Sequence, residues 1–402
     1  MMDFDNIRSQ FDIYKNNPDL VYLDSGATSL KPNCVLEKMQ EYYTKYGVNI
    51  HRGVYDLSYI ASSEYDKARE SVSKFIGSDF SEIIFKRNAS EALNYVALTW
   101  GEANLKEGDV VLSTELEHHS SVLPWMKLCE RKKATLNYIK LNEEGRITLS
   151  EVEKALNDKV KVLAITLVSN VMGYVTPIDE VIKLAHKYNV LVIVDASQAV
   201  AHFKIDVKKM DCDFLAFSGH KMMGPTGVGV LYGKKSILKN LAPLEYGGDM
   251  NDEVSLHSVT VKEIPYRFEA GTPAIAEVLG LGRAIEFINE VGLDKIEAHS
   301  KELHKYALKL LSDVKGITIY NKTSETPIIA FNIDGVHPHD ASTLFDQNNI
   351  CLRAGHHCAQ LLTKWLKVNG TLRASFYIYN TKEDVERFVF AIKENVKFFS
   401  QF

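Results

Sequence analysis

The chain has few cysteines, few prolines and no long hydrophobic run. Its 402 residues include 5 Cys, 10 Pro and 23 Gly, so neither a disulfide framework nor a proline-rich disordered chain is indicated. No apolar run approaches the roughly 18–20 residues that span a bilayer. The opening residues, MMDFD, carry acids where a secretory signal has basic residues. We therefore expect a cytoplasmic protein without a membrane segment.

A large excess of charge of one sign is also lacking. Lys and Arg number 47 against 52 Asp and Glu, which gives a formal net charge of −5. This balance argues against nucleic acid or an anionic membrane as the main partner. With 46% hydrophobic and 25% charged residues, the composition is typical of a globular protein with a large core.

The middle of the chain alternates short apolar runs with helical patterns. The runs occupy residues 110–113, 160–168, 190–194, 214–217 and 229–232, and a helical pattern occupies 177–186. Such alternation predicts βαβ units, that is, an α/β fold with a mostly parallel sheet covered by helices. After about residue 290 the pattern predicts a smaller α+β part, with long helices, a strand at 328–333 and a helix from 382.

Polar residues that follow strands are the first candidates for chemistry, because open parallel sheets bind ligands beyond the carboxyl ends of their strands. Asp195 ends one run, and a carboxylate there needs a cationic partner or serves as a helix cap. Lys221 lies in a Gly-rich turn, where burial would lower its pKa and favour a Schiff base. An ordinary loop lysine is the alternative. The glycine spacing fits neither a dinucleotide fingerprint nor a P-loop.

Three further segments carry candidate groups. His118 and His119 are adjacent but lack the spacing of a metal site, so no metal is expected, and a ring over an aromatic cofactor or a surface histidine remains possible. Ala89 and Ser90 open a helix whose amides suit a phosphate, or form a simple cap. Cys358 lies beside two histidines and near an arginine, which favour its thiolate. Together these groups meet the needs of pyridoxal 5′-phosphate (PLP), with a thiol added.

Two motifs carry a resemblance to a known family: RAGHHCAQ, residues 353–360, and SGHK followed by GPTG, residues 218–227. From residue 21 to 381 the sequence closely resembles the class V aminotransferase-like, fold-type I PLP enzymes, and within them the SufS-type (group II) cysteine desulfurases. The resemblance implies a large PLP-binding domain, residues 20–290, with a mostly parallel seven-stranded sheet. Residues 1–19 and 291–402 would form a small domain that carries the cysteine loop.

The resemblance also implies a role for each site residue. Lys221 would bind PLP, Asp195 would pair with the ring nitrogen, Gln198 would bind the ring oxygen and His118 would stack on the ring. Ser90, the backbone of Ala89, Ser218 and His220 would hold the phosphate. Asn170 and Arg373 would bind the substrate carboxylate, and Arg353 would lie beside the loop of the nucleophile Cys358. Thr272, with Arg52, would come from the neighbouring subunit of a homodimer.

The implied reaction converts L-cysteine to L-alanine and leaves the sulfur as a persulfide on Cys358. A SufE-like or SufU-like protein, or a SufBCD-type scaffold, would accept it for iron–sulfur cluster assembly. Selenocysteine lyase activity, another class V aminotransferase-like reaction and a catalytically silent scaffold are the alternatives. The chain departs from the common pattern at Ser90 (usually Thr), Gly26 (usually Ala) and Leu361 (often Pro).

Overall fold

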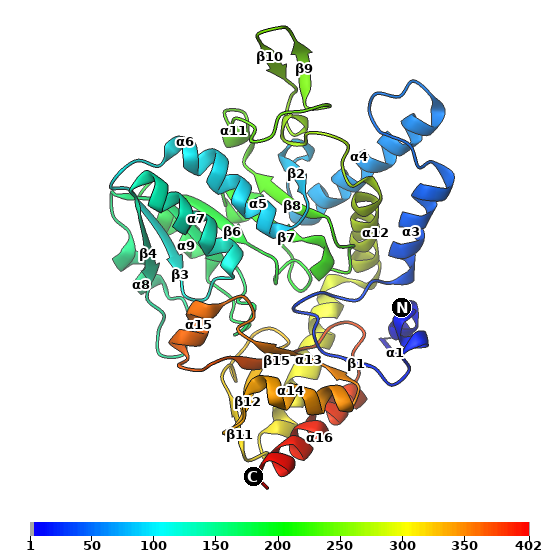
Figure 1. The fold of residues 1–402 in the computed structure, drawn as a ribbon, viewed down its shortest axis with the longest axis vertical. Helices are drawn as coiled ribbons and strands as arrows, with labels where there is room; N and C mark the ends of the chain where they lie inside the picture. The colour runs from blue at the N-terminus through cyan, green and yellow to red at the C-terminus, as the bar shows by residue number, and fades with distance from the viewer. Residues whose placement is uncertain (1–3, 402) are drawn as a thin grey trace.

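The computed structural model describes residues 4–401, and its larger part is built on a seven-stranded sheet (Figure 1). The strand order is β2-β8-β7-β6-β5-β3-β4. All neighbours from β4 to β7 pair in parallel, whereas β8 runs antiparallel to β7 and β2. The predicted mostly parallel α/β sheet is therefore confirmed. The strands are β2 (Ile83–Lys86), β3 (Val110–Thr114), β4 (Thr135–Ile139), β5 (Val160–Thr166), β6 (Leu191–Asp195), β7 (Phe214–Ser218) and β8 (Gly229–Gly233).

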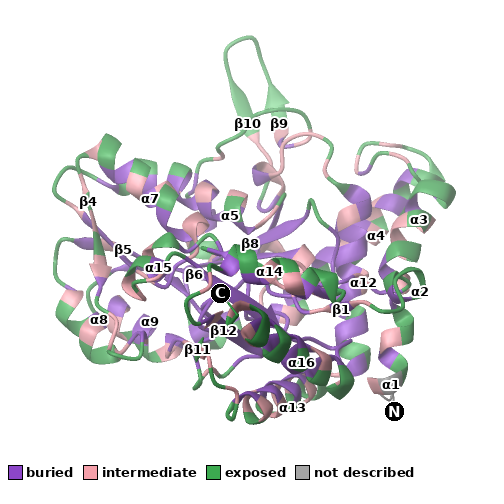
Figure 2. Ribbon diagram, turned by 60° about the horizontal axis from the view of Figure 1, so that its bottom comes forward, coloured by how far each residue is buried: buried purple, intermediate pink, exposed green. Residues whose placement is uncertain are grey.

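Helices cover both faces of this sheet, which explains why its central strands read as continuous apolar runs. Successive side chains of a strand point to opposite faces. Val162 and Ile193 pack on one face with Trp125, whereas Leu163 and Val192 belong to the core of the other face. Figure 2 shows the resulting buried layer. The first face carries α5 (Ala89–Val96) and α7 (His119–Lys132), and the second carries α3 (Asn33–Lys45), α4 (Asp56–Ile76), α9 (Ile178–His186) and α12 (Ile275–Val291).

The smaller part has its own antiparallel sheet, in the order β11-β12-β15-β14, and its own core. Its strands are β11 (Ile317–Ile319), β12 (Ile328–Ile333), β14 (Arg353–Gly355) and β15 (Thr371–Ser375). Its helices are α13 (Leu293–Leu311), α14 (Pro338–Gln347), α15 (Gln360–Trp365) and α16 (Lys382–Phe399). The predicted α+β character of this part is confirmed.

The N-terminal segment lies against this smaller part. The guanidinium of Arg8 donates to both carboxylate oxygens of Asp384, at 2.9 and 2.8 Å, and β1 (Val21–Tyr22) pairs with β13 (Ile350–Cys351). The contact of Arg8 agrees with the proposed small domain of residues 1–19 and 291–402. The pairing of β1 does not agree with the proposed large domain of residues 20–290, because β1 lies within those bounds but joins the smaller part. The domain bounds therefore stay a proposal. Residues 1–3 and 402, at the two ends of that small domain, lie outside the described residues.

Short elements complete the architecture. They are α1 (Phe4–Ile7), α2 (Ile13–Asn16), α6 (Glu102–Asn104), α8 (Leu149–Ala155), α10 (Val207–Met210), α11 (Lys235–Leu238), β9 (Asn251–Val254) and β10 (Val259–Val261). The hairpin of β9 and β10 projects from the top of the molecule in Figure 1, and its Leu256 is 95% exposed.

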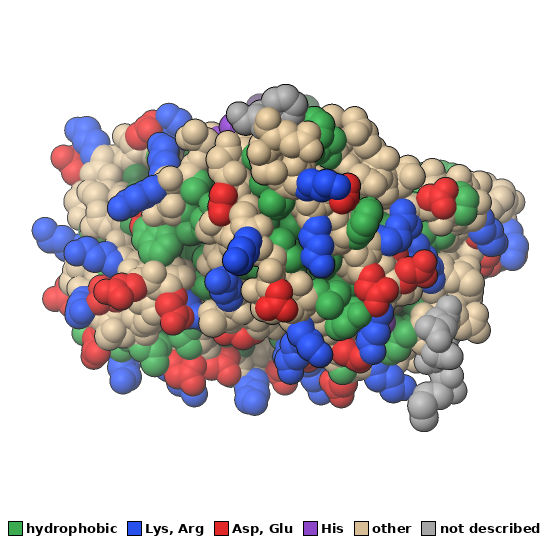
Figure 3. Space-filling view, turned by 90° about the horizontal axis from the view of Figure 1, so that it is seen from below, with side chains coloured by type: hydrophobic (Ala, Val, Ile, Leu, Met, Phe, Trp, Pro, Cys, Tyr) green, Lys and Arg blue, Asp and Glu red, His purple; other side chains and the backbone are tan. Residues whose placement is uncertain are grey.

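Acidic and basic side chains are interspersed on the face seen in Figure 3. Over residues 4–401, no helix is both long and apolar enough to cross a bilayer.

Candidate active site

A cavity of about 330 Å³ lies beyond the carboxyl ends of β6 and β7, bordered by the loop between β14 and α15. Most of the predicted residues gather there. Its lining includes Ala89, Ser90, His118, Asn170, Asp195, Ser218, His220, Lys221, Arg353, Cys358 and Arg373. Three predicted residues, Gln198, Thr272 and Arg52, do not line it. Gln198 is buried with its amide on the carbonyl of Gly26 at 2.7 Å, and Thr272 lies on the rim of two other cavities, one of them shared with Arg52.

Lys221 provides the amine of this cavity. It follows β7 in a tight turn, and burial lowers the pKa of its side chain to about 8, although the charge of Asp195 opposes that shift. Among the described residues its Nζ has no hydrogen-bond partner. A buried lysine with this pKa is partly unprotonated near neutral pH and can act as a nucleophile or a base.

Asp195 ends β6 and is 5% exposed. Its Oδ1 accepts a hydrogen bond from the amide of Ser197 at 2.9 Å, so it closes the local turn. Its negative charge also acts on Lys221 and His118. The carboxylate therefore closes a turn and does not cap a helix, since the next helix begins only at Val207, and Lys221 is the cationic group on which its charge acts.

His118 caps the start of α7. Its Nδ1 accepts a hydrogen bond from the amide of Ser120 at 3.1 Å. Burial, assisted by the positive charge of Lys221, lowers the pKa of His118 to about 4. The ring is therefore neutral near pH 7, with its proton on Nε2.

The start of α5 supplies the groups predicted to bind phosphate. The side chain of Asn88 accepts from the amide of Glu91, and the amide of Ala89 donates to Ser218 Oγ at 2.8 Å. The hydroxyl of Ser90 is hydrogen-bonded to that of Ser120. Among the described residues the amide of Ser90 has no acceptor. An anion at this helix start would therefore meet one free amide and two hydroxyls.

Two arginines stand opposite each other at the far side of the cavity, because Arg353 of β14 pairs in register with Arg373 of β15. Asp24 lies between them: its Oδ1 is 3.1 Å from Arg373 Nη2, and its Oδ2 is 3.9 Å from Arg353 Nε. Like charges on paired strands repel, so this carboxylate stabilises the pair. Asp24 was missed from the sequence, although it follows a short strand.

Arg373 is buried and keeps unused donors. Its Nη1 donates to the carbonyl of Asn170 at 2.8 Å, while its Nε and the Oδ1 of Asn170 are buried without a partner. A methyl group at Gly26 would lie 3.2 Å from Arg373 Cζ. Gly26, which we identified as a departure from the family pattern, therefore lets the guanidinium lie closer to the backbone than alanine would.

Cys358 is the exposed cysteine of the chain. Burial raises the pKa of the other four thiols, Cys34, Cys129, Cys212 and Cys351. Cys358 is also close enough to act electrostatically on Lys221 and Arg373.

Within residues 4–401, no group of three or more His, Cys, Asp or Glu side chains is placed so that it could hold a metal ion.

Two further buried groups were missed from the sequence. Glu117 is 1% exposed; its Oε1 accepts from the amide of Thr166 at 3.0 Å and from Thr114 Oγ1 at 2.9 Å. Glu269, three residues before Thr272, forms a two-pronged ion pair with Arg69 at 2.8 and 2.7 Å. Glu117 directly precedes the two histidines, but nothing in the local sequence indicates its burial, and no local pattern indicates the Arg69–Glu269 pair.

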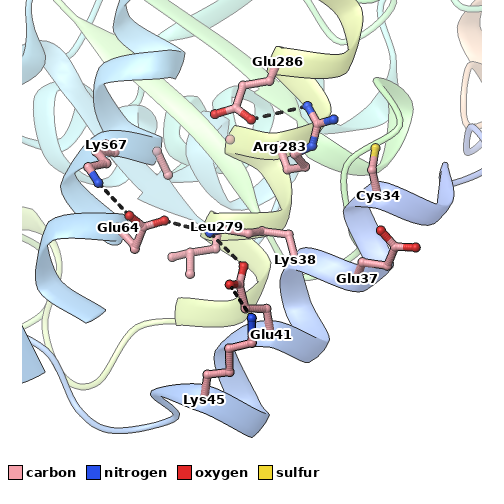
Figure 4. A pocket seen from close by; sticks show the side chains of 12 residues that line it. Cys34, Glu37, Lys38, Glu41, Lys45, Glu64, Lys67, Leu279, Arg283 and Glu286 are labelled. Atoms are coloured by element: carbon pink, nitrogen blue, oxygen red, sulfur yellow. Dashed lines mark hydrogen bonds and ion pairs between the residues drawn. The ribbon is translucent and has the colours of Figure 1, made fainter. Parts of the chain in front are cut away.

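A cavity of about 530 Å³ between α3, α4 and α12 offers less chemistry despite its size (Figure 4). Its charges pair with one another: the amine of Lys38 lies 2.7 Å from Glu64 and 3.2 Å from Glu41, and Arg283 lies 3.3 Å from Glu286. Its cysteine, Cys34, has a thiol pKa raised by burial. We therefore assign the active site to the cavity of Lys221.

The chain is similar to known proteins over most of its length. The family model described as aminotransferase class-V matches residues 21–388. A "probable cysteine desulfurase" of Halalkalibacterium halodurans is 48% identical over 385 residues, which cover 96% of this chain and 95% of that protein.

Two solved structures are similar over almost the whole chain. A cysteine desulfurase from Thermococcus onnurineus has a TM-score of 0.94 and 40% identity, and covers 99% of both chains. The cysteine desulfurase CsdA of Escherichia coli has a TM-score of 0.93 and 35% identity, with the same coverage.

The buried Glu117 leads to a prediction about stability. Burial raises its pKa to about 8 from an ordinary value of 4.5, so the folded chain holds a proton that the unfolded chain loses above pH 4.5. The contribution of Glu117 to the free energy of unfolding is therefore fully present below pH 4.5. It is lost as the pH rises toward 8, by up to about 1.4 kcal/mol per pH unit. Glu117→Gln removes this loss.

Urea unfolding at pH 5, 6, 7 and 8 measures the difference between the two proteins. We expect Glu117→Gln to gain on the wild type at each step, while Glu153→Gln, at an exposed position, follows the wild type. A difference that stays constant with pH would show that Glu117 is ionised in the folded protein.

Proposed function

The chain belongs to the class-V aminotransferase family and, within it, to the cysteine desulfurases, and we propose that it uses PLP, Lys221 and Cys358 to convert L-cysteine to L-alanine. The observation that carries this proposal is one cavity that holds a buried lysine amine, a carboxylate and an exposed thiol. An aminotransferase needs the first two groups but has no use for the third.

The residues of the cavity fit PLP. Lys221 has an unpartnered amine for the aldehyde, and Asp195 supplies a carboxylate for the ring nitrogen. The neutral ring of His118 suits stacking. The free amide of Ser90, with Ser218 and His220, would hold the phosphate, and the role of Gln198 at the ring oxygen stays a proposal.

PLP, when bound, supplies the electron sink that makes the Cα–H of an amino acid acidic. Lys221 is the base for that proton, because burial keeps its pKa at about 8. His118 offers an Nε2 proton to the same cavity. These two groups would move protons at the substrate carbons.

The substrate carboxylate would bind at Arg373 and Asn170. The buried Nε of Arg373 has no partner, and Asp24 compensates only part of the charge of the two arginines. A carboxylate forms its strongest hydrogen bonds with a guanidinium. Arg353, half exposed beside the cysteine loop, would add positive charge at the mouth.

Cys358 would take the sulfur. Its thiolate attacks the sulfur of the substrate, the bond from that sulfur to Cβ breaks, and the electron pair stays with the carbon. Protonation of that carbon gives alanine, and Cys358 keeps the sulfur as a persulfide. Because Cys358 is exposed, an acceptor thiol can reach it.

We propose a SufE-like or SufU-like protein or a SufBCD-type scaffold as the acceptor of this sulfur. We propose iron–sulfur cluster assembly as the purpose of the transfer and the cytoplasm as its location.

Substitution of the cysteine tests this function. In Cys358→Ser, we expect alanine production from L-cysteine to fall at least about 100-fold, because the sulfur has no thiolate to accept it. The visible absorption of bound PLP should still change when L-cysteine is added. Cys351→Ser, at a partly buried cysteine of the same domain, should keep the wild-type rate.

Three results would contradict the proposal. Alanine production by Cys358→Ser at the wild-type rate would indicate another class V reaction. A wild-type protein that prefers L-selenocysteine and ignores L-cysteine would indicate a selenocysteine lyase. A protein that stays colourless with added PLP would indicate a catalytically silent scaffold.

A homodimer whose subunits share the active site explains the position of Thr272 away from the cavity. In a mixture of Lys221→Ala and Thr272→Ala subunits, each mixed dimer then has one intact site, so activity should recover to roughly a quarter of the wild type. Activity of unmixed and mixed samples after subunit exchange measures this. No recovery would show that Thr272 acts within its own subunit.

A further inference from the structure

The loop that carries Cys358 has an unfavourable backbone conformation. His357 and Cys358 have φ angles of +52° and +55°, in the left-handed region that non-glycine residues seldom adopt. Two such residues in succession persist only where surrounding contacts hold them. The position of the thiol therefore depends on contacts from outside the loop.

His119 supplies two of these contacts, one on each side of Ala359. Its backbone amide donates to the carbonyl of Cys358 at 2.7 Å. Its Nε2 accepts a hydrogen bond from the amide of Gln360, the first residue of α15, at 3.1 Å. The residue before Cys358 has a separate contact, because Asn170 Nδ2 donates a hydrogen bond to the backbone carbonyl of His357 at 2.8 Å.

His119 also has a fixed position relative to the other groups of the site. It is the first residue of α7, and His118 directly before it caps that helix. Trp125 and Leu128 of α7 are buried in the core against the large sheet. One rigid helix start thus holds both the ring of His118 and the loop of Cys358.

The hydrogen bond from Gln360 requires an unprotonated Nε2, so the ring of His119 must be neutral. Burial and the nearby His356 of the cysteine loop lower the pKa of His119. Lys127 and Arg131 of α7 line the groove beside it.

We propose that His119 is a positioning residue, which holds Cys358 against the cavity of Lys221 by binding the backbone on both sides of Ala359. The proposal rests on the proposed function, because the loop matters for catalysis only if Cys358 receives the sulfur. His119 touches neither the substrate nor the cofactor in this account. It acts on the sulfur-transfer step alone.

Three variants of the PLP-loaded protein test this role. His119→Ala removes the acceptor for the Gln360 amide, and His119→Gln places an amide oxygen where Nε2 lies. Lys127→Ala is the matched control, because this exposed residue of α7 pairs only with Glu130 on the same helix. Should His119→Ala fail to fold, His119→Asn takes its place, since the shorter side chain does not reach Gln360.

Hydrogen exchange measures the contact directly. We expect the Gln360 amide to exchange at least roughly tenfold faster in His119→Ala, and at close to the wild-type rate in His119→Gln and Lys127→Ala. Two rapid assays with L-cysteine separate the chemical steps. Persulfide formation on Cys358 should slow roughly tenfold or more in His119→Ala, while loss of the substrate α-proton stays within about twofold of the wild type.

Each other outcome overturns the proposal. Unchanged exchange and unchanged persulfide formation in His119→Ala would show that the loop holds itself. A slower α-proton loss would place His119 at the cofactor, and a defect that His119→Gln fails to restore would exclude the acceptor role. If the wild type itself forms no persulfide, the proposed function fails, and the exchange of Gln360 still reports separately on the contact.

Discussion

The burial of Lys221 beside Asp195 at the carboxyl edge of the large sheet is the constraint on which the site depends. Parallel strands end together, so β6 and β7 place a carboxylate and an amine in one cavity. Burial gives the lysine a pKa of about 8, and the same burial, with the lysine's charge, keeps His118 neutral. The cavity thus holds a base and a neutral proton donor near pH 7.

The smaller part of the chain adds two arginines and a thiol to this edge of the large sheet. Its sheet sets Arg353 opposite Arg373, and Asp24 lowers the repulsion between them. The loop after β14 then brings Cys358 to the cavity, where His119 of α7 forms two hydrogen bonds with the backbone of the loop. In the proposed reaction the nucleophile and the base therefore come from different parts of the chain, and the contacts between these two parts decide whether the thiol meets the substrate sulfur.

The sequence predicted the fold and most of the cavity, because both follow from local patterns. Apolar runs between helices predict a parallel sheet, and polar residues after those runs lie at its edge, as Asp195 and Lys221 do. Asp24 and the second contact of His119 depend on partners more than 200 residues away. No periodicity reports such pairings. The protonated state of Glu117 was likewise missed, because it depends on burial by surrounding elements.

Mass spectrometry of the wild-type protein after reaction with ³⁴S-labelled L-cysteine, without reductant or acceptor, tests the central claim most directly. The account predicts one labelled sulfur per chain, on the proteolytic peptide that contains Cys358. The same label on a peptide that contains Cys34, Cys129, Cys212 or Cys351 would contradict it. Alanine formed from the labelled substrate with no label on any cysteine residue of the chain would contradict it as well.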